Sequence, residues 1–531
     1  MEDERIAEGV EMTSIEPLTD DSGKEVEGCF VAHVKDKEII AGYETKSVIT
    51  VNDLEANLLE SEPVDIARGR TLELNWLKIA GVEAVDDGNG TMMVKLPYGI
   101  NNMNSLPVEY ASGAMSVIAE GYDDEVKDCG SLDFSLPVTL IVTSLSGETK
   151  EYKVVPYFSN LPVVYMTTPL AITSKDVWTA DCEMQIWNAG DKDGTYQKVN
   201  VKGRGNTTWS YPKKPYAIKL NKKAEVLGMP KHKRWCLLAN WMDRTVMRND
   251  VAFEIGRRLT GLDWTPHGEY VDVVFNGRMV GNYYLCEQIK VDENRVDIVE
   301  MESDDVSEET ITGGYLVELD TYFDEVNKFR TKRRNLPVNI KEPDEDVLVP
   351  AQLDYIQGYF NRIEDILYGG ASGDVFDLID VDSFVDWWLV YELAFCGEPG
   401  HPKSSYMHKD RGGKLKAGPI WDFDWGSFYT FETRWRNQGS IYYNDLFKKH
   451  EFVAKVKERW ETAKLSLVTI PDYIDKRYLE IQESAELNGK MWPISIVVNQ
   501  DEKLSVTDAV ERMKTRYTQR FEWMDQQIQA M

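Results

Sequence analysis

Two aspartates stand two residues apart within an aromatic run, "GPIWDFDWGSF" (418–428). Carboxylates such as Asp422 and Asp424 are rarely buried among tryptophan and phenylalanine unless a counter-charge stabilises them. If the stretch is a strand, both carboxylates point to one side and repel each other unless a cation lies between them. Mg²⁺ prefers a few carboxylate oxygens together with phosphates and water, which makes the pair a candidate metal site. The alternative is a structural pairing with basic side chains such as Arg434 or Lys416.

A glycine-rich loop, "GRGNTT", lies within "VKGRGNTTWSYPKKPYAIKL" (201–220), between two segments that are typical of strands. Glycines let backbone amides approach a phosphate, and Arg204 adds positive charge. A short loop of this kind is also an ordinary hairpin turn, so it is a weak signal alone.

Lys219 lies on the predicted strand "YAIKL", on the face opposite Ile218. In kinases a strand lysine of this kind grips the α and β phosphates and pairs with a helix glutamate. The available glutamate is Glu254, on a predicted helix. Glu254 could instead pair with Arg257 or Arg258 along its own helix face.

Two further stretches carry chemically capable residues. The strand "GNYYLCEQI" (281–289) ends near Glu287, where a hinge between two lobes would lie, although an ordinary strand end fits as well. The loop "GEPGHPKSSYMHKD" (397–410) contains Glu398 and Lys403, and otherwise reads as a loop that ends a helix.

The elements that must position these residues fall into three parts. Residues 1–160 contain segments in which residue types alternate or β-branched residues follow one another, and turns separate these segments. This pattern predicts a small all-β sandwich of the immunoglobulin type. Residues 165–300 are rich in predicted strands and contain one helix. Residues 301–531 are predicted to be helical. We therefore expect an α+β chain in which a two-lobed domain follows a sandwich, with a cleft between the lobes.

The composition disfavours several classes of partner and of site. The 531 residues predict two to four domains, and the net charge of −30 disfavours nucleic acid and anionic membranes as partners. Six scattered cysteines give neither a zinc site nor a disulfide framework, although one or two disulfides are compatible with them. No apolar run is long enough to span a membrane, and no signal peptide is visible.

The order of these elements along the chain is that of a protein kinase: glycine loop, strand lysine, helix glutamate, hinge, loop and aspartates. The consensus motifs of protein kinases are absent. The amino-acid sequence resembles the CotH (spore-coat) family of atypical kinases. The resemblance rests on "KGRGNTTWSYPKKPYAIKL", "LLANWMDRTVMRNDVAFEIGRRL", "GNYYLCEQIKVDENRVDI" and "GPIWDFDWGSF", which span about 200–428. It implies a kinase-like fold, ATP with Mg²⁺ or Mn²⁺, and phosphate transfer to Ser or Thr of a protein.

The resemblance also implies roles for individual residues. The phosphates would contact Arg204, Gly205 and Asn206, and Lys219 would anchor them with Glu254 as its partner. Glu287 would lie at the nucleotide hinge. A divalent metal would bind Asp422, with Asp424 as a second or supporting ligand.

One departure concerns the catalytic step. The family commonly has an Asp as base and an Asn as metal ligand in the loop where this sequence has "SSYMHKD". Here Ser404 stands near the expected Asn, and Glu398 is the nearby acid, so Glu398 would have to act as the base.

A pseudokinase that binds a glycan or protein at a cell surface through its sandwich is therefore the competing function, and transfer of AMP is a third. By its composition the chain also resembles secreted or surface proteins of bacteria whose signal peptide has been removed.

Overall fold

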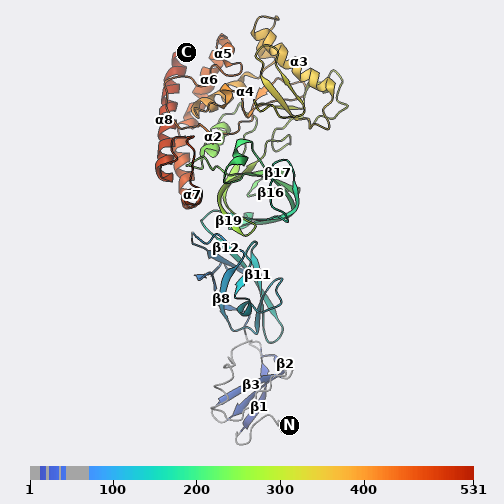
Figure 1. Ribbon diagram of the computed structural model, residues 1–531, viewed down its shortest axis with the longest axis vertical. Coiled ribbons are helices and arrows are strands. Elements are labelled where there is room, and N and C mark those ends of the chain that lie inside the picture. The colour runs from blue at the N-terminus through green and yellow to red at the C-terminus, as the bar shows by residue number, and fades with distance from the viewer. Residues whose placement is uncertain (1–11, 20–22, 35–36, 43–70, 98) are drawn as a thin grey trace. The chain divides into compact units, whose positions relative to one another are not determined.

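The computed structural model describes residues 12–19, 23–34, 37–42, 71–97 and 99–531. The chain divides into two compact units, Met1–Phe158 with Val274–Met279, and Ser159–Val273 with Val280–Met531. Each unit has its own sheets (Figure 1).

The described residues of the first unit form three sheets. An antiparallel sheet contains β1 (Met12–Thr19), β2 (Glu25–Val34) and β3 (Lys37–Gly42). A second, in the order β10-β8-β4-β5, contains β4 (Leu74–Ile79), β5 (Val82–Glu83), β8 (Leu106–Ser112) and β10 (Ser131–Leu132). The third, in the order β6-β7-β12-β11-β9, contains β6 (Val85–Asp86), β7 (Thr91–Lys95), β9 (Ser116–Ala119), β11 (Val138–Thr143) and β12 (Thr149–Tyr157). A short helix, α1, spans Val126–Cys129.

Alternation of buried and accessible side chains explains these strands. In β11, Val138, Leu140 and Val142 are buried while the residues between them are partly accessible, which is the period-2 pattern of a sheet with one face in a core. The turn at Gly147 joins β11 to β12, and Gly147 has φ of 80°, a conformation that glycine adopts without strain.

The second unit begins with a closed barrel in the order β13-β14-β15-β16-β17-β19-β18. Its strands are β13 (Val163–Thr167), β14 (Thr179–Trp187), β15 (Gly194–Gly203), β16 (Tyr216–Val226), β17 (Met229–Leu238), β18 (Gly268–Phe275) and β19 (Arg278–Glu287). The tip of the β18–β19 hairpin, residues 274–279, groups with the first unit. Short 3-10 turns lie between β14 and β15, at Gly190–Lys192, and between β15 and β16, at Thr207–Ser210.

A five-stranded sheet follows in the order β21-β22-β20-β23-β24. It contains β20 (Tyr315–Leu319), β21 (Lys328–Arg330), β22 (Pro337–Glu342), β23 (Ser405–Lys409) and β24 (Lys416–Ala417). The part of the chain beyond residue 300, predicted to be helical, therefore also contains a sheet. The strands are short, and the pairing of β20 with β23 joins segments almost ninety residues apart.

The helices of the second unit are α2 (Arg248–Arg257), α3 (Pro350–Leu367), α4 (Val381–Leu393), α5 (Tyr443–Leu446), α6 (His450–Leu467), α7 (Ile470–Met491) and α8 (Val506–Ala530). Further 3-10 turns lie at Thr310–Thr312, Val375–Asp377 and Glu398–Gly400. None of the helices in the described part of the chain is both long and apolar enough to cross a membrane.

The helical core forms around α4, which packs on α2, α6 and α8 (Figure 1). Every residue of α4 from Ser383 to Leu393 is buried. An aspartate caps the start of this helix, since the Asp380 carboxylate accepts a hydrogen bond from the Ser383 amide at 2.9 Å. On α8, the apolar side chains Val510 and Met513 are buried at helical spacing.

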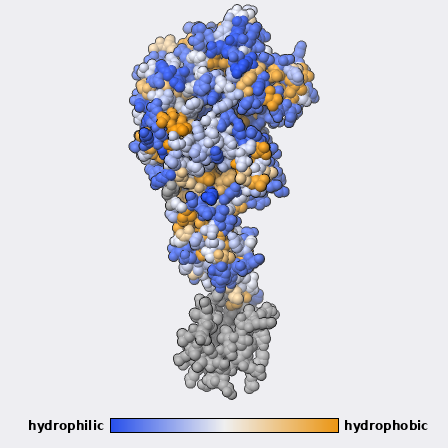
Figure 2. Space-filling model, viewed as in Figure 1, coloured by the Kyte–Doolittle hydropathy of each residue, from blue (hydrophilic) through white to orange (hydrophobic). Residues whose placement is uncertain are grey.

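The visible surface is mainly hydrophilic. On the face shown in Figure 2, hydrophilic residues predominate and hydrophobic ones gather in small separate groups. All described cysteine side chains, at positions 129, 182, 236, 286 and 396, are free thiols, so none of these five forms a disulfide.

Candidate active site

A cavity of about 1130 Å³ lies within the second unit. Its lining comes from the ends of β15 and β17, the segment after β19, the β20–β22 sheet, the 397–406 loop and the aspartate loop. Cavities of several hundred cubic ångströms with converging polar groups are the usual setting of small-molecule sites.

The glycine loop forms one part of the lining. After β15, the chain turns at Gly205 with φ of 78°, and a Cβ at this position would lie 2.0 Å from the Thr208 hydroxyl oxygen. Only glycine fits such a turn without a shift of its neighbours. The Arg204 guanidinium lies 5.3 Å from the centre of the Trp421 ring. The loop is closed by a 2.7 Å hydrogen bond between the Thr207 and Tyr322 hydroxyls.

The Asn206 side chain lines the cavity but is not free, because its oxygen accepts a hydrogen bond from Lys175. Thus Arg204, Gly205 and Asn206, which were expected to act together, do lie together in the lining.

Two cations that the sequence did not single out also line the cavity. Lys202 and Arg234 both lie close to the Trp178 ring, with their charged groups 5.0 and 4.9 Å from its centre. Burial, and then the charge of Arg234, lower the pKa of Lys202. Among the described residues no carboxylate lies within ion-pair distance of either cation; the acids that act on them are Asp176 for Lys202, and Asp344 and Glu342 for Arg234.

The aspartate loop contributes to the lining of the same cavity. Asp422 has φ of 69°, so the residues adopt a loop with a left-handed turn rather than the predicted strand. The two carboxylates nevertheless come together: burial, and then the charge of Asp422, raise the pKa of Asp424 well above its usual range. Asp424 is 6% exposed, and its Oδ1 atom has no hydrogen-bond partner within the described part of the chain.

The alternative partners of this pair are engaged elsewhere. Arg434 pairs with Glu432, and Lys416 lies 2.8 Å from Asp263. The positive charge that acts on the aspartates is that of Arg204, which opposes the rise in the pKa of Asp424.

Glu398 lies in the same cavity, at the start of a 3-10 turn. It is 5% exposed. Burial, and then the charge of Asp422, raise its pKa to about 8, while Lys403 acts in the opposite direction. Ser404, at the position of the expected Asn, also lines the cavity, and its backbone amide donates to Asp320 at 3.2 Å.

The divalent metal fits this donor set. Within the described residues no group of three or more His, Cys, Asp or Glu could hold a metal by itself. However, Mg²⁺ is commonly held by one or two carboxylates with the substrate's phosphates and water completing its shell. The unpartnered Oδ1 of buried Asp424 beside Asp422 is the observation that favours a cation here.

Three expected site residues do not line the cavity. Of the described residues that form its lining, none is Lys219, Glu254 or Glu287. Lys219 pairs in register with Arg234, and the arginine, not the lysine, belongs to the lining. The Gln288 and Ile289 side chains, directly after Glu287, are part of the lining instead.

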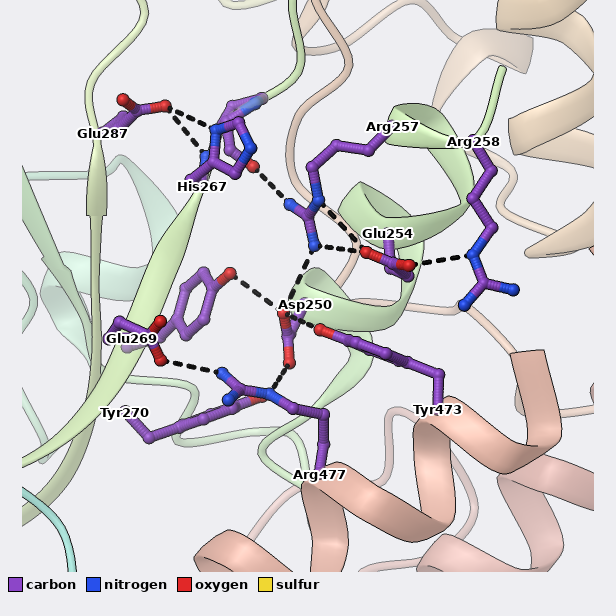
Figure 3. Close-up of polar contacts among 12 residues, drawn as sticks. Asp250, Glu254, Arg257, Arg258, His267, Glu269, Tyr270, Glu287, Tyr473 and Arg477 are labelled. Carbon is purple, nitrogen blue, oxygen red and sulfur yellow. Dashed lines mark hydrogen bonds and ion pairs between the residues drawn. The ribbon is translucent and has the colours of Figure 1, made fainter. Parts of the chain in front are cut away.

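Glu254 and Glu287 have other partners (Figure 3). Glu254 accepts hydrogen bonds from Arg257 at 2.9 Å and Arg258 at 2.8 Å, which is the pairing along its own helix. Buried Glu287 pairs with Arg295 and accepts a hydrogen bond from the His267 amide at 2.9 Å. This corrects the expectation that Glu254 meets Lys219 at the site.

A family model for the CotH kinase protein matches residues 201–524, more than half of the chain. The chain belongs to this family. The match covers every segment that lines the cavity from β15 onward, and the family indicates a kinase-like function. No curated protein matches the chain.

Proposed function

We propose that this CotH family member is an atypical protein kinase that transfers the γ-phosphate of ATP to Ser or Thr of a protein. The observation that carries the proposal is the buried Asp424, with an unpartnered oxygen, beside Asp422 in one cavity with Lys202, Arg204, Arg234 and a glycine turn. Such a site combines a place for metal with a place for phosphates.

Asp422 and Asp424 would hold Mg²⁺ or Mn²⁺. When bound, the metal neutralises negative charge on the phosphate oxygens. Arg204, Lys202 and Arg234 would bind the phosphates directly, and the Gly205 turn lets the backbone approach them. This assignment replaces Lys219 as the phosphate anchor.

Glu398 would take up the proton of the acceptor hydroxyl at its carboxylate. As that hydroxyl oxygen forms its bond to the γ-phosphorus, the bond to ADP breaks and ADP leaves. Phosphoryl transfer depends mainly on positioning and charge neutralisation, so a glutamate in this place needs only to orient the hydroxyl and accept the proton.

The test compares the wild type with Asp422→Ala. ATP at about 100 times its dissociation constant, with Mg²⁺ or Mn²⁺, stabilises a binding protein by roughly 2.7 kcal/mol. We expect this stabilisation in the wild type and its loss in Asp422→Ala. If the variant binds metal and nucleotide as well as the wild type does, the metal assignment fails.

Transfer is followed with ATP labelled at the γ or the α phosphate. Label from the γ position on Ser or Thr supports the kinase, whereas label from the α position shows AMP transfer. A wild type that binds Mg·ATP and labels no protein, itself included, is a pseudokinase.

A further inference from the structure

The aspartate loop is held through its backbone by three buried side chains from distant parts of the second unit. Within residues 423–427, two amides and two carbonyls bond to these side chains. Two of the side chains begin α2, and the third precedes α8.

Asn249, on α2, holds the point between the two aspartates. Its Oδ1 atom accepts a hydrogen bond from the Phe423 amide at 2.7 Å, and its Nδ2 donates to the Asn240 side chain at 3.2 Å. Asn249 is 3% exposed, so water does not replace these bonds easily.

Asn499 holds the other side of the loop. Its Nδ2 donates to the carbonyl of Asp424 at 2.8 Å and to that of Met242 at 3.1 Å. Its Oδ1 accepts from the Gly426 amide at 2.8 Å. One side chain therefore fixes the loop on both sides of Trp425 and ties it to the segment before α2.

Arg248 completes the arrangement. Its Nε donates to the Ser427 carbonyl at 2.8 Å, and its guanidinium pairs with Asp243 and, at 2.6 Å, with Asp501. All three charged side chains of this group are at most 2% exposed.

These contacts satisfy the loop's backbone without using the Asp424 Oδ1 atom. They also hold Asp422 in a left-handed conformation that residues other than glycine rarely adopt and that surrounding structure must enforce. We propose that Asn249 and Asn499 are positioning residues that fix the loop backbone so that the Asp422 and Asp424 carboxylates meet as a metal site. This inference rests on the proposed function.

The test uses Asn249→Ala and Asn499→Ala in the full chain, with Asn282→Ala as matched control. Asn282 is 1% exposed and donates to the Ser484 hydroxyl at 2.9 Å, so its loss also removes a buried hydrogen bond, but not one to the loop. Affinity for Mn·ADP is measured by calorimetry at a temperature where every variant is folded. Hydrogen exchange of peptides covering 420–428 is measured on the same samples without ligand. Asn249→Ser and Asn499→Ser replace any alanine variant that does not fold.

We expect each loop variant to weaken Mn·ADP binding by about tenfold or more, as changes to groups that orient metal ligands typically do, and the control by less than about twofold. Exchange within 420–428 should accelerate in the loop variants alone. Equal affinities in all three variants, or unchanged exchange, would overturn the positioning role. A wild type that does not bind Mn·ADP overturns the proposed function and the metal part of this inference, and the exchange rates then still decide whether the asparagines restrain the loop.

Discussion

Lys202 and Arg204 stand two residues apart where β15 ends, and Lys202 lies opposite Ala217 on the next strand. Ala217 in turn lies opposite Cys236, two residues after Arg234. Because side chains alternate along a strand, residues two apart share a face, and the small Ala217 leaves room between the cations. The register of the strands therefore brings these cations together at the cavity. A local sequence motif does not reveal this arrangement.

Lys202→Ala and Arg234→Ala should each weaken binding of Mg·ATP by roughly tenfold to a hundredfold. Losing a hydrogen bond to a charged group costs about 1.5–3 kcal/mol, which corresponds to that range. Lys219→Ala is the control, because Lys219 carries the same charge on the neighbouring strand. Calorimetric titration measures all three variants. A loss with Lys219→Ala alone would return the anchoring role to that lysine.

Glu398→Gln should leave Mg·ATP binding within about threefold of the wild type and lower the rate of transfer by 10²-fold or more, as expected for loss of a general base. A base acts only when unprotonated. With a pKa of about 8 in the metal-free protein, kcat/KM of the wild type should rise with pH and level off above about 8. A charge-neutralising cation beside Asp422 would move this midpoint downward.

Steady-state rates from pH 6 to 9 check the profile, and the Gln variant should show no such rise. Equal transfer by Glu398→Gln and the wild type would remove Glu398 from the catalytic step.

At the scale of elements, α2 connects the aspartate loop to the barrel and to α7. Its first residues hold the loop, while Asp250 accepts hydrogen bonds from Tyr284 of β19 and from Tyr473 and Arg477 of α7, at 2.9–3.0 Å (Figure 3). Asp250 is 1% exposed, whereas Glu254 lies toward the accessible side with its two arginines. These two acidic residues of α2 thus contribute very differently to the free energy of unfolding.

Asp250→Ala should lower the free energy of unfolding by about 3–5 kcal/mol, because the Tyr284 and Tyr473 hydroxyls and the Nε of Arg477 lose the buried acceptor that they share. Arg477 keeps its pairs with Glu269 and Glu480. Glu254→Gln should cost less than about 1 kcal/mol, since its pairs with Arg257 and Arg258 are partly solvated. Neither carboxylate lines the cavity, so Glu254→Gln should leave Mg·ATP affinity unchanged. Urea unfolding and calorimetry measure the two quantities. Loss of nucleotide affinity in Glu254→Gln would contradict this assignment and favour a role at the site.

Local periodicity was sufficient for α2, α4 and α8, because each buries a continuous stripe or a whole surface over several turns. It was insufficient for the β20–β24 sheet, whose strands have between two and six residues and pair across long sequence separations. Asp422 and Glu398 line the same cavity, as the order of segments in the family leads one to expect. The placements of Lys219 and Glu254 could not be predicted, because they depend on strand register and on which face of α2 meets the barrel.

At the scale of the whole molecule, the net charge of −30 contrasts with the cations of the cavity. Lys202, Arg204 and Arg234 supply positive charge to a cavity whose lining also contains acids such as Asp344 and Asp346. The strongly acidic composition disfavours anions on the rest of the surface. Repulsion of the anionic nucleotide by the rest of the surface thus favours its binding at the cavity.

Every residue that lines the cavity belongs to the second unit. Binding of Mn·ADP to the full chain should therefore protect amides of the second unit from hydrogen exchange, first of all in 203–211, 397–406 and 418–428. Peptides from 74–157 should exchange at the same rate with and without ligand, because a ligand stabilises only the unit that unfolds with loss of its site.

Exchange measured by mass spectrometry on the full chain gives both regions in one experiment, and Asp422→Ala with the same ligand provides the unliganded reference. Protection confined to 74–157 would move the nucleotide site to the first unit. Protection in both regions would mean that binding is coupled to the first unit as well, contrary to the separation expected from a cavity built by one unit alone.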